Sequence, residues 1–199
     1  MSIPIIDARP KGLAIFLILA GSIGWFAAFA LTLDKFQLLE NPDAQLGCNF
    51  SILVQCGRNL ESWQGSVLGF PNPILGLAGW IAPIAVGVAI LAGARFARWF
   101  WVAFNIGLLG AIGFVIWLIS QSIFVLGTLC PWCMVTWSVT IPTFILVTAF
   151  SLKNDVFPAS PTVRRIAGVV TSWIVVVTLA CYLVVAIIAQ LRLDVLSYL

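Results

Sequence analysis

Cysteine is the side chain through which this sequence is best equipped to do chemistry. The chain has five cysteines and no histidine, and four of the cysteines form two close sets. Cys48 and Cys56 are separated by seven residues, whereas Cys130 and Cys133 form a C-x-x-C sequence. Thiols at these spacings can form a disulfide, exchange it with another thiol pair, or bind zinc. Cys181 stands alone within an apolar stretch, which predicts a buried and inert side chain.

Hydropathy predicts the elements that must position these cysteines. Of the 199 residues, 62% are hydrophobic and 9% are charged, which is more apolar surface than a soluble core can bury. Stretches without Asp, Glu, Lys or Arg provide five segments long enough to cross a hydrocarbon layer that takes roughly 20 helical residues, two of them within the continuous stretch 99–152. We therefore predict an all-α integral membrane protein with a single domain over residues 1–199, folded as a five-transmembrane-helix bundle. The predicted spans are about 12–33, 73–94, 99–122, 129–151 and 166–190, with a large extracytoplasmic loop over 34–72.

The distribution of Lys and Arg predicts the orientation of the bundle. If the chain alternates sides at each span, most basic residues share the side of the amino terminus. The positive-inside rule then places the amino terminus in the cytoplasm of a multi-pass protein of the cell (cytoplasmic or inner) membrane. Both cysteine sets fall on the extracytoplasmic side, which is oxidising enough to keep disulfides. The sequence contains no stretch in which basic residues alternate with aromatic residues, so it does not indicate a nucleic-acid partner. The basic residues on the cytoplasmic side are Arg9, Lys11, Arg95, Arg98, Lys153, Arg164 and Arg165, against Lys35, Arg58 and Arg192 opposite.

Helix position distinguishes Cys48 and Cys56, the loop pair, from Cys130 and Cys133, the CxxC pair. The CxxC pair lies at a predicted helix amino terminus, where unpaired backbone amides and the helix dipole favour a thiolate, so it is suited to exchange. For the loop pair, a structural disulfide and a redox role are both open. A four-thiolate zinc site is a further alternative, but the gap of seven residues does not match a zinc knuckle, and we predict no metal. With no histidine and no charged residue inside the predicted spans, ion or proton transport is disfavoured.

Further motifs lie between the two cysteine pairs. Ser62 is followed by Trp63, and a Gly-Phe-Pro-Asn sequence over 69–72 leads into the second predicted span. The order of loop pair, Ser62, Asn72 and late CxxC pair resembles the vitamin K epoxide reductase family, in particular its bacterial disulfide-forming members without a fused thioredoxin domain. The resemblance covers most of the first four predicted helices. The unrelated DsbB-type quinone reductases place their C-x-x-C in the first outward loop, so the order here is reversed.

The resemblance implies a four-helix core around a quinone, with a fifth helix beside it. The loop pair would be the shuttle pair, and the CxxC pair would lie beside a menaquinone- or ubiquinone-type electron acceptor. Ser62 and Asn72 would bind a quinone oxygen, although a helix cap for Ser62 and a turn for Asn72 remain alternatives. Because no thioredoxin-like domain follows the fifth span, the implied partner is a separate extracytoplasmic thioredoxin-fold, DsbA-like protein.

Trp137 stands where animal members of the family have a tyrosine, so the resemblance implies plain quinone reduction rather than epoxide reduction. The predicted function is a quinone-dependent thiol–disulfide oxidoreductase that supports disulfide formation in exported proteins. The alternative is a membrane structural or zinc-binding protein whose cysteines brace its outer loops. Only the enzyme would change the redox state of both cysteine pairs together with a quinone.

Overall fold

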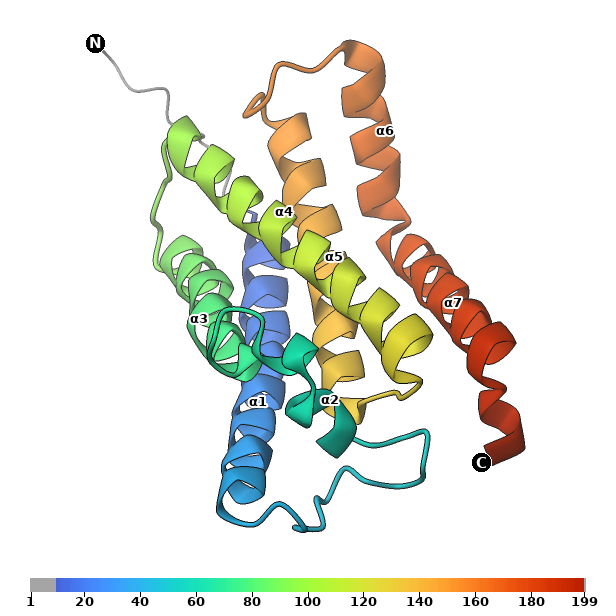
Figure 1. Cartoon of the computed structure of the whole chain (residues 1–199). Coiled ribbons are helices and arrows are strands. Elements are labelled where there is room, and N and C mark those ends of the chain that lie inside the picture. Colours follow the sequence, from blue (N-terminus) through green and yellow to red (C-terminus); the bar gives the residue numbers. More distant parts are fainter. Residues whose placement is uncertain (1–9, 199) are drawn as a thin grey trace.

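The fold is a bundle of long apolar helices, seen in a computed structural model that describes residues 10–198 (Figure 1). Among these residues, five helices are long and apolar enough to cross a membrane. The prediction of an all-α protein with five spans is therefore confirmed, while the single domain over 1–199 stays a prediction. The five helices are α1 (Lys11–Glu40), α3 (Asn72–Leu91), α4 (Arg98–Ser120), α5 (Pro131–Lys153) and α7 (Ile174–Leu193).

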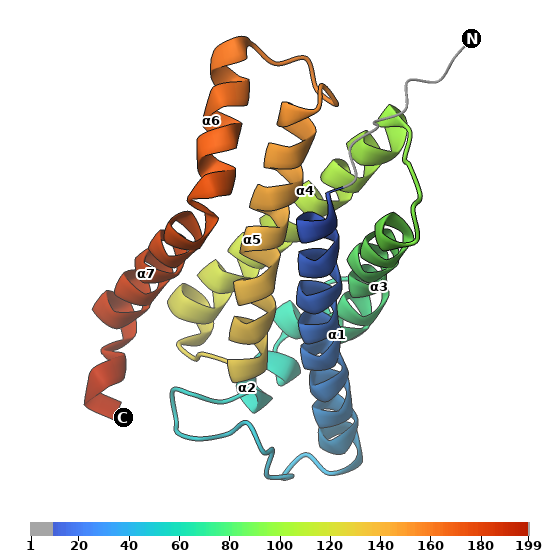
Figure 2. The same ribbon diagram turned by 180° about the vertical axis from the view of Figure 1, so that it is seen from behind.

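Helix α1 is central to the bundle and packs against both α3 and α5 (Figure 2). Glycines let α1 and α3 approach closely, since a Cβ added to Gly87 would lie 2.6 Å from the carbonyl oxygen of Ala14 and one added to Gly24 would meet the Trp80 ring. Small residues serve this purpose in membrane helices, because close backbone packing replaces a hydrophobic driving force between them. A buried cluster joins these helices to α4: Ala14, Leu17, Val86, Ile90, Trp101, Leu108, Val147 and Val156.

Helix α1 is longer than the sequence indicated. The predicted span ends at residue 33 and the predicted loop begins at 34, whereas the helix continues to Glu40. The charge of Asp34 ends the apolar run, but an acidic residue costs a helix only a fraction of a kcal/mol, about 0.7 at most. In the extension, Leu38 is buried in the same cluster as the loop pair, and this packing supports the added turns. Asp34 therefore lies on a helix rather than in the loop.

The prediction of a single fifth helix over 166–190 is wrong. The chain instead forms α6 (Pro161–Ser172) and then α7, with a break at Trp173. The hydroxyls of Thr171 and Ser172 donate to the carbonyl groups four residues earlier, a pattern that bends helices. Only α7 is long and apolar enough to be the fifth candidate span.

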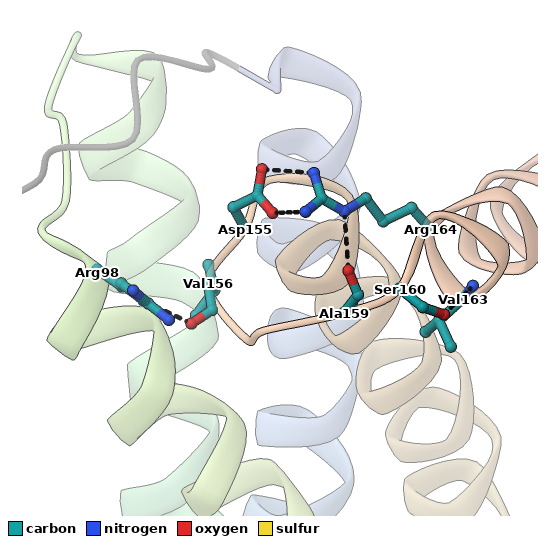
Figure 3. Close-up of polar contacts among 7 residues, drawn as sticks. All are labelled: Arg98, Asp155, Val156, Ala159, Ser160, Val163 and Arg164. Carbon is teal, nitrogen blue, oxygen red and sulfur yellow. Dashed lines mark hydrogen bonds and ion pairs between the residues drawn. The ribbon is translucent and has the colours of Figure 1, made fainter.

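A short connection over residues 154–160 joins α5 to α6 (Figure 3). Arg98 of α4 donates through Nε to the carbonyl oxygen of Val156 at 2.7 Å, and Arg164 of α6 forms an ion pair with Asp155. The connection lies at one end of the bundle, whereas the loop that follows α1 lies at the opposite end (Figures 1 and 2). Arg98 and Arg164 therefore lie at the end of the bundle opposite the loop cysteines.

Candidate functional site

The loop after α1 is closed by a disulfide between Cys48 and Cys56, whose Cα atoms lie 5.8 Å apart. Both residues are buried, with 4% of Cys48 and 0% of Cys56 exposed. Asn49 holds the turn between them, because its Oδ1 accepts hydrogen bonds from the backbone N–H groups of Cys56 at 3.0 Å and Gly57 at 3.3 Å. The short helix α2 (Gly57–Glu61) follows at once, so Cys56 is fixed at the start of a helix.

A backbone bridge brings the loop pair to the CxxC pair. Val54 pairs in parallel with Leu129, and hydrogen bonds of 2.7 and 3.0 Å join Leu129 to the main chain on either side of Val54. Cys56 and Cys130 follow these paired residues and share one buried cluster. The cluster comprises Leu31, Leu38, Leu46, Cys48, Cys56, Leu60 and Cys130, with Trp132 and Cys133 packed against it.

Asn59 on α2 ties the same two segments together through its side chain. Its Nδ2 donates to the hydroxyl of Thr128 at 2.9 Å, and the Ser122 hydroxyl donates to the Thr128 carbonyl. Ser122 belongs to a π-helical turn, η2 (Gln121–Leu126), that ends α4. Sequence reasoning missed Asn59 as a site residue because its partner lies 69 positions away in the chain.

Helix α5 begins at Pro131, so the CxxC pair occupies its amino terminus. Cys130 is the residue that caps the helix, and the backbone N–H of Cys133 donates to Cys130 Sγ at 3.4 Å. An amide donor and the positive end of a helix dipole both stabilise a thiolate. Both thiols are free, but Cys130 is fully buried whereas Cys133 is partly exposed.

A cavity of about 1160 Å³ lies beside Cys133. Its walls are mainly apolar side chains of α1, α3, α4 and α5, and one end is formed by α2 and by the short 3-10 helix η1 (Trp63–Ser66). Cys133 and Trp137 are among the lining residues, and Cys130 is not. The cavity therefore presents one reactive thiol to an apolar space. Its polar lining side chains are Asn59, Ser62, Gln64, Asn72, Gln121, Thr136 and Thr140.

Ser62 and Asn72 both line this cavity, but their polar atoms are engaged within the protein. The Ser62 hydroxyl donates to the carbonyl of Asn59 at 2.8 Å and makes no helix-capping bond. Asn72 Nδ2 donates to the Gln64 carbonyl at 2.6 Å, while Asn72 Oδ1 accepts from the Val67 N–H at 3.2 Å. Asn72 thus braces the turn that covers the cavity, and for both residues contact with a quinone stays a prediction.

Asp34 is a second group that sequence reasoning did not connect with the cysteines. Its Oδ2 lies 3.3 Å from Cys48 Sγ, and its carboxylate lies within 4.8 Å of Cys56 Sγ. While the disulfide is closed, neither sulfur is a thiolate, so these groups are not a zinc site in this oxidation state. Cys130 and Cys133 lie outside this group, so the described residues do not assemble the four-thiolate arrangement considered from the sequence.

Cys181 lies on α7 and is a half-buried free thiol, rather than the buried side chain that the sequence predicted. Its neighbour Tyr182 donates its hydroxyl to the carbonyl of Ser138 on α5, which docks α7 against the bundle. Only 11% of the apolar window of α7 is buried within the protein, so lipid is left to cover most of the helix. Cys181 is a residue neither of the cavity nor of the cysteine cluster.

The chain is similar to a known protein family over most of this fold. The family model described as "Vitamin K epoxide reductase family" matches residues 15–148. This match includes both cysteine pairs, most of α1, all of α3 and α4, and most of α5. No curated protein matches the chain. The match confirms the resemblance that the order of the motifs indicated.

Proposed function

Because this chain belongs to the vitamin K epoxide reductase family, we propose that it transfers electrons from an extracytoplasmic protein dithiol to a membrane quinone. Membership of the family makes it a thiol–disulfide oxidoreductase, and its five apolar helices make it a multi-pass membrane protein. The proposed donor is a separate thioredoxin-fold protein of the DsbA type, and the proposed acceptor is a menaquinone- or ubiquinone-type molecule. One observation carries the proposal: the loop disulfide and Cys130 share a buried cluster, while Cys133 opens on the cavity.

Electron transfer begins at the loop disulfide. A partner thiolate attacks Cys48 Sγ, a disulfide forms between the partner and Cys48, and Cys56 is released as a thiolate. Cys56 then attacks Cys130 of the oxidised CxxC pair, which forms a Cys56–Cys130 disulfide and releases Cys133 as a thiolate. The second thiolate of the partner displaces Cys48, and Cys48 attacks Cys56. This last exchange closes the loop disulfide again and releases Cys130.

Each cycle moves two electrons and, in net terms, two protons from the partner dithiol to the quinone. Cys130 and Cys133 return to a disulfide by passing two electrons to the bound quinone, with two protons taken up to form the quinol. These protons come from the thiols or from water on the outward side, because the sequence has no histidine. The net reaction converts a partner dithiol and a quinone into a partner disulfide and a quinol. In this scheme, a closed loop disulfide with free Cys130 and Cys133 is the state that precedes quinone reduction.

Burial supports the division of roles between the four cysteines. Cys56 and Cys130 are each 0% exposed, so they are suited to exchange with each other rather than with the thiol of another protein. Cys133 faces an apolar cavity of the kind that holds flat organic ligands. Ser62 and Asn72 are the proposed contacts to a quinone oxygen. Their internal hydrogen bonds do not use every donor and acceptor site of the hydroxyl and amide groups, and the remaining sites are free to bind the quinone.

The charge distribution supports an orientation with the amino terminus in the cytoplasm and both cysteine pairs outside. Lys11, Arg98 and Arg164 lie on elements that meet at the end of the bundle opposite the loop disulfide (Figure 1). Lys and Arg concentrate on the cytoplasmic side of membrane proteins. The proposed location is therefore the cell membrane, with the exchange reaction on its extracytoplasmic face.

The test is an anaerobic single-turnover reaction of the purified, reduced protein with a soluble quinone. We expect rapid quinol formation by the wild type and by the matched Cys181→Ala control, and none by Cys133→Ala. No quinol from the wild type would refute the proposal and leave the cysteines as braces or zinc ligands. Quinol formation by Cys133→Ala at the wild-type rate would remove the CxxC pair from the reaction.

A further inference from the structure

Gln64 lines the cavity and carries a buried polar atom that has no hydrogen-bond partner among the described residues. This residue lies on η1 with 3% of its surface exposed, and it lines the cavity together with Cys133. Its Nε2 donates to Oε1 of Gln121 at 3.3 Å. Its own Oε1 has no hydrogen-bond partner among residues 10–198. A buried amide oxygen without a partner costs free energy, so its retention calls for a reason.

The scaffold does not need this oxygen. The Gln64 segment is held through its main chain, because the Gln64 carbonyl accepts the 2.6 Å hydrogen bond from Asn72. On the other side, a Cβ added to Gly65 would lie 3.1 Å from the carbonyl oxygen of Leu60, so η1 packs tightly against α2. The side-chain amide is thus positioned rigidly at the cavity, while its free end serves no structural bond.

The other polar groups in this wall are less available. Ser62 gives its hydroxyl proton to Asn59, and both ends of the Asn72 amide bond the covering turn. Gln121 uses its oxygen to hold Gln64. The free end of the Gln64 amide is therefore the polar atom in this part of the cavity that is both buried and unsatisfied.

We propose that Gln64, braced by Gln121, is a positioning residue that hydrogen-bonds an oxygen of the quinone head group. The inference rests on the proposed function, since it assigns a further contact to the same cavity. The free Oε1 accepts a hydrogen bond, so it fits a quinol hydroxyl and not a quinone carbonyl. If the paired amides of Gln64 and Gln121 rotate together, Gln64 Nε2 takes the place of Oε1 and can donate to the quinone carbonyl. One side chain can thus bind both the substrate and the product.

The experiment compares Gln64→Met with Gln37→Met, a matched change at an exposed position near the end of α1. Menadione is the probe. Its dissociation constant is measured by tryptophan quenching in the fully oxidised protein, and its KM and kcat are measured in turnover. For Gln64→Met we expect the dissociation constant and KM for menadione to rise about fivefold to tenfold, because the substitution removes one neutral hydrogen bond to the head group. Reduction of the loop disulfide by dithiothreitol, which needs no quinone, should keep its wild-type rate.

The outcomes separate this inference from the proposed function. Failure of the wild type to reduce or bind menadione would refute the proposed function itself. Turnover by the wild type, with an unchanged dissociation constant and KM in Gln64→Met, would overturn the role of Gln64. If dithiothreitol no longer reduces the loop disulfide of Gln64→Met at the wild-type rate, that variant is misfolded, and Gln121→Met is used as the test of the inference instead. A rise of its menadione dissociation constant supports the positioning role, and wild-type binding overturns it.

Discussion

Replacing Asp34 by asparagine should change which sulfur of the loop disulfide is attacked. The carboxylate lies 3.3 Å from Cys48 Sγ and within 4.8 Å of Cys56 Sγ. When a thiolate attacks a disulfide, one sulfur bonds to the attacker and the other leaves with a negative charge. A carboxylate beside Cys48 opposes charge on Cys48 more than charge on Cys56. It therefore directs attack to Cys48 and makes Cys56, the neighbour of Cys130, the leaving thiolate.

The two distances set the size of this preference. With an effective dielectric constant of about 20, the Coulomb energies at 3.3 and 4.8 Å differ by about 1.6 kcal/mol. This value is an upper bound, because 4.8 Å is the longest separation allowed for Cys56. Asp34 is only partly buried, and solvent screens such a charge, so we expect roughly half of the bound. The predicted preference for attack at Cys48 is then about threefold to fivefold.

The assay uses the Cys130→Ser background, in which the released Cys56 thiolate has no Cys130 sulfur to attack. The oxidised protein reacts with glutathione at pH 8, where a carboxyl group is ionised, and is quenched in acid after a short time. Alkylation and peptide mapping then give the ratio of glutathione on Cys48 to glutathione on Cys56. Asp34→Asn should lower this ratio about threefold to fivefold, whereas Asp43→Asn, an exposed carboxylate in the same loop, should leave it unchanged. An equal ratio in wild type and Asp34→Asn would refute the electrostatic reasoning.

Three further substitutions test the scaffold. Asn59→Ala removes the hydrogen bond to Thr128 and should lower the free energy of unfolding by about 1 to 2 kcal/mol, measured by denaturant titration in detergent. The same substitution should slow thiol–disulfide exchange between the two cysteine pairs, measured by quenched-flow trapping. Gly87→Ala places a Cβ 2.6 Å from the Ala14 carbonyl and should cost about 1 to 3 kcal/mol in the same titration. Arg164→Ala breaks an ion pair whose side chains are 43% and 59% exposed, so a loss above about 1 kcal/mol would contradict its assignment as a surface pair.

Hydropathy predicted the spans well where lipid alone decides them. The predicted 73–94 and 129–151 differ by a few residues from Asn72–Leu91 and Pro131–Lys153. It failed where other forces set the helix ends. Helix α1 continues beyond the apolar run because its extension packs on the cysteine loop, and the fifth segment breaks at Trp173 although neither proline nor glycine stands at the break.

The spacing of the cysteines was enough to identify both pairs, because a C-x-x-C at a helix start is a local pattern. Asp34, Asn59 and Gln64 were not identified, because each becomes part of the site through a partner distant in the chain. Their sequence neighbours carry no periodic signal that distinguishes them from ordinary surface polar residues. Asn72 was identified by the motif, but its bonds to the turn that covers the cavity became visible only in the folded chain.

The burial of Cys48 limits how the partner can reach it. Only 4% of Cys48 is exposed, and attack on a disulfide needs the thiolate in line with the S–S bond, so the loop must move before exchange. The bridge from Val54 to Leu129 and the bond from Asn59 to Thr128 hold the Cys56 side of the loop to Cys130. The segment before Cys48 has no comparable tie to the CxxC segment among the described residues. It follows that local opening of the loop costs the least free energy on the Cys48 side. Such opening exposes Cys48 Sγ to the partner thiolate and keeps Cys56, the leaving sulfur, beside Cys130.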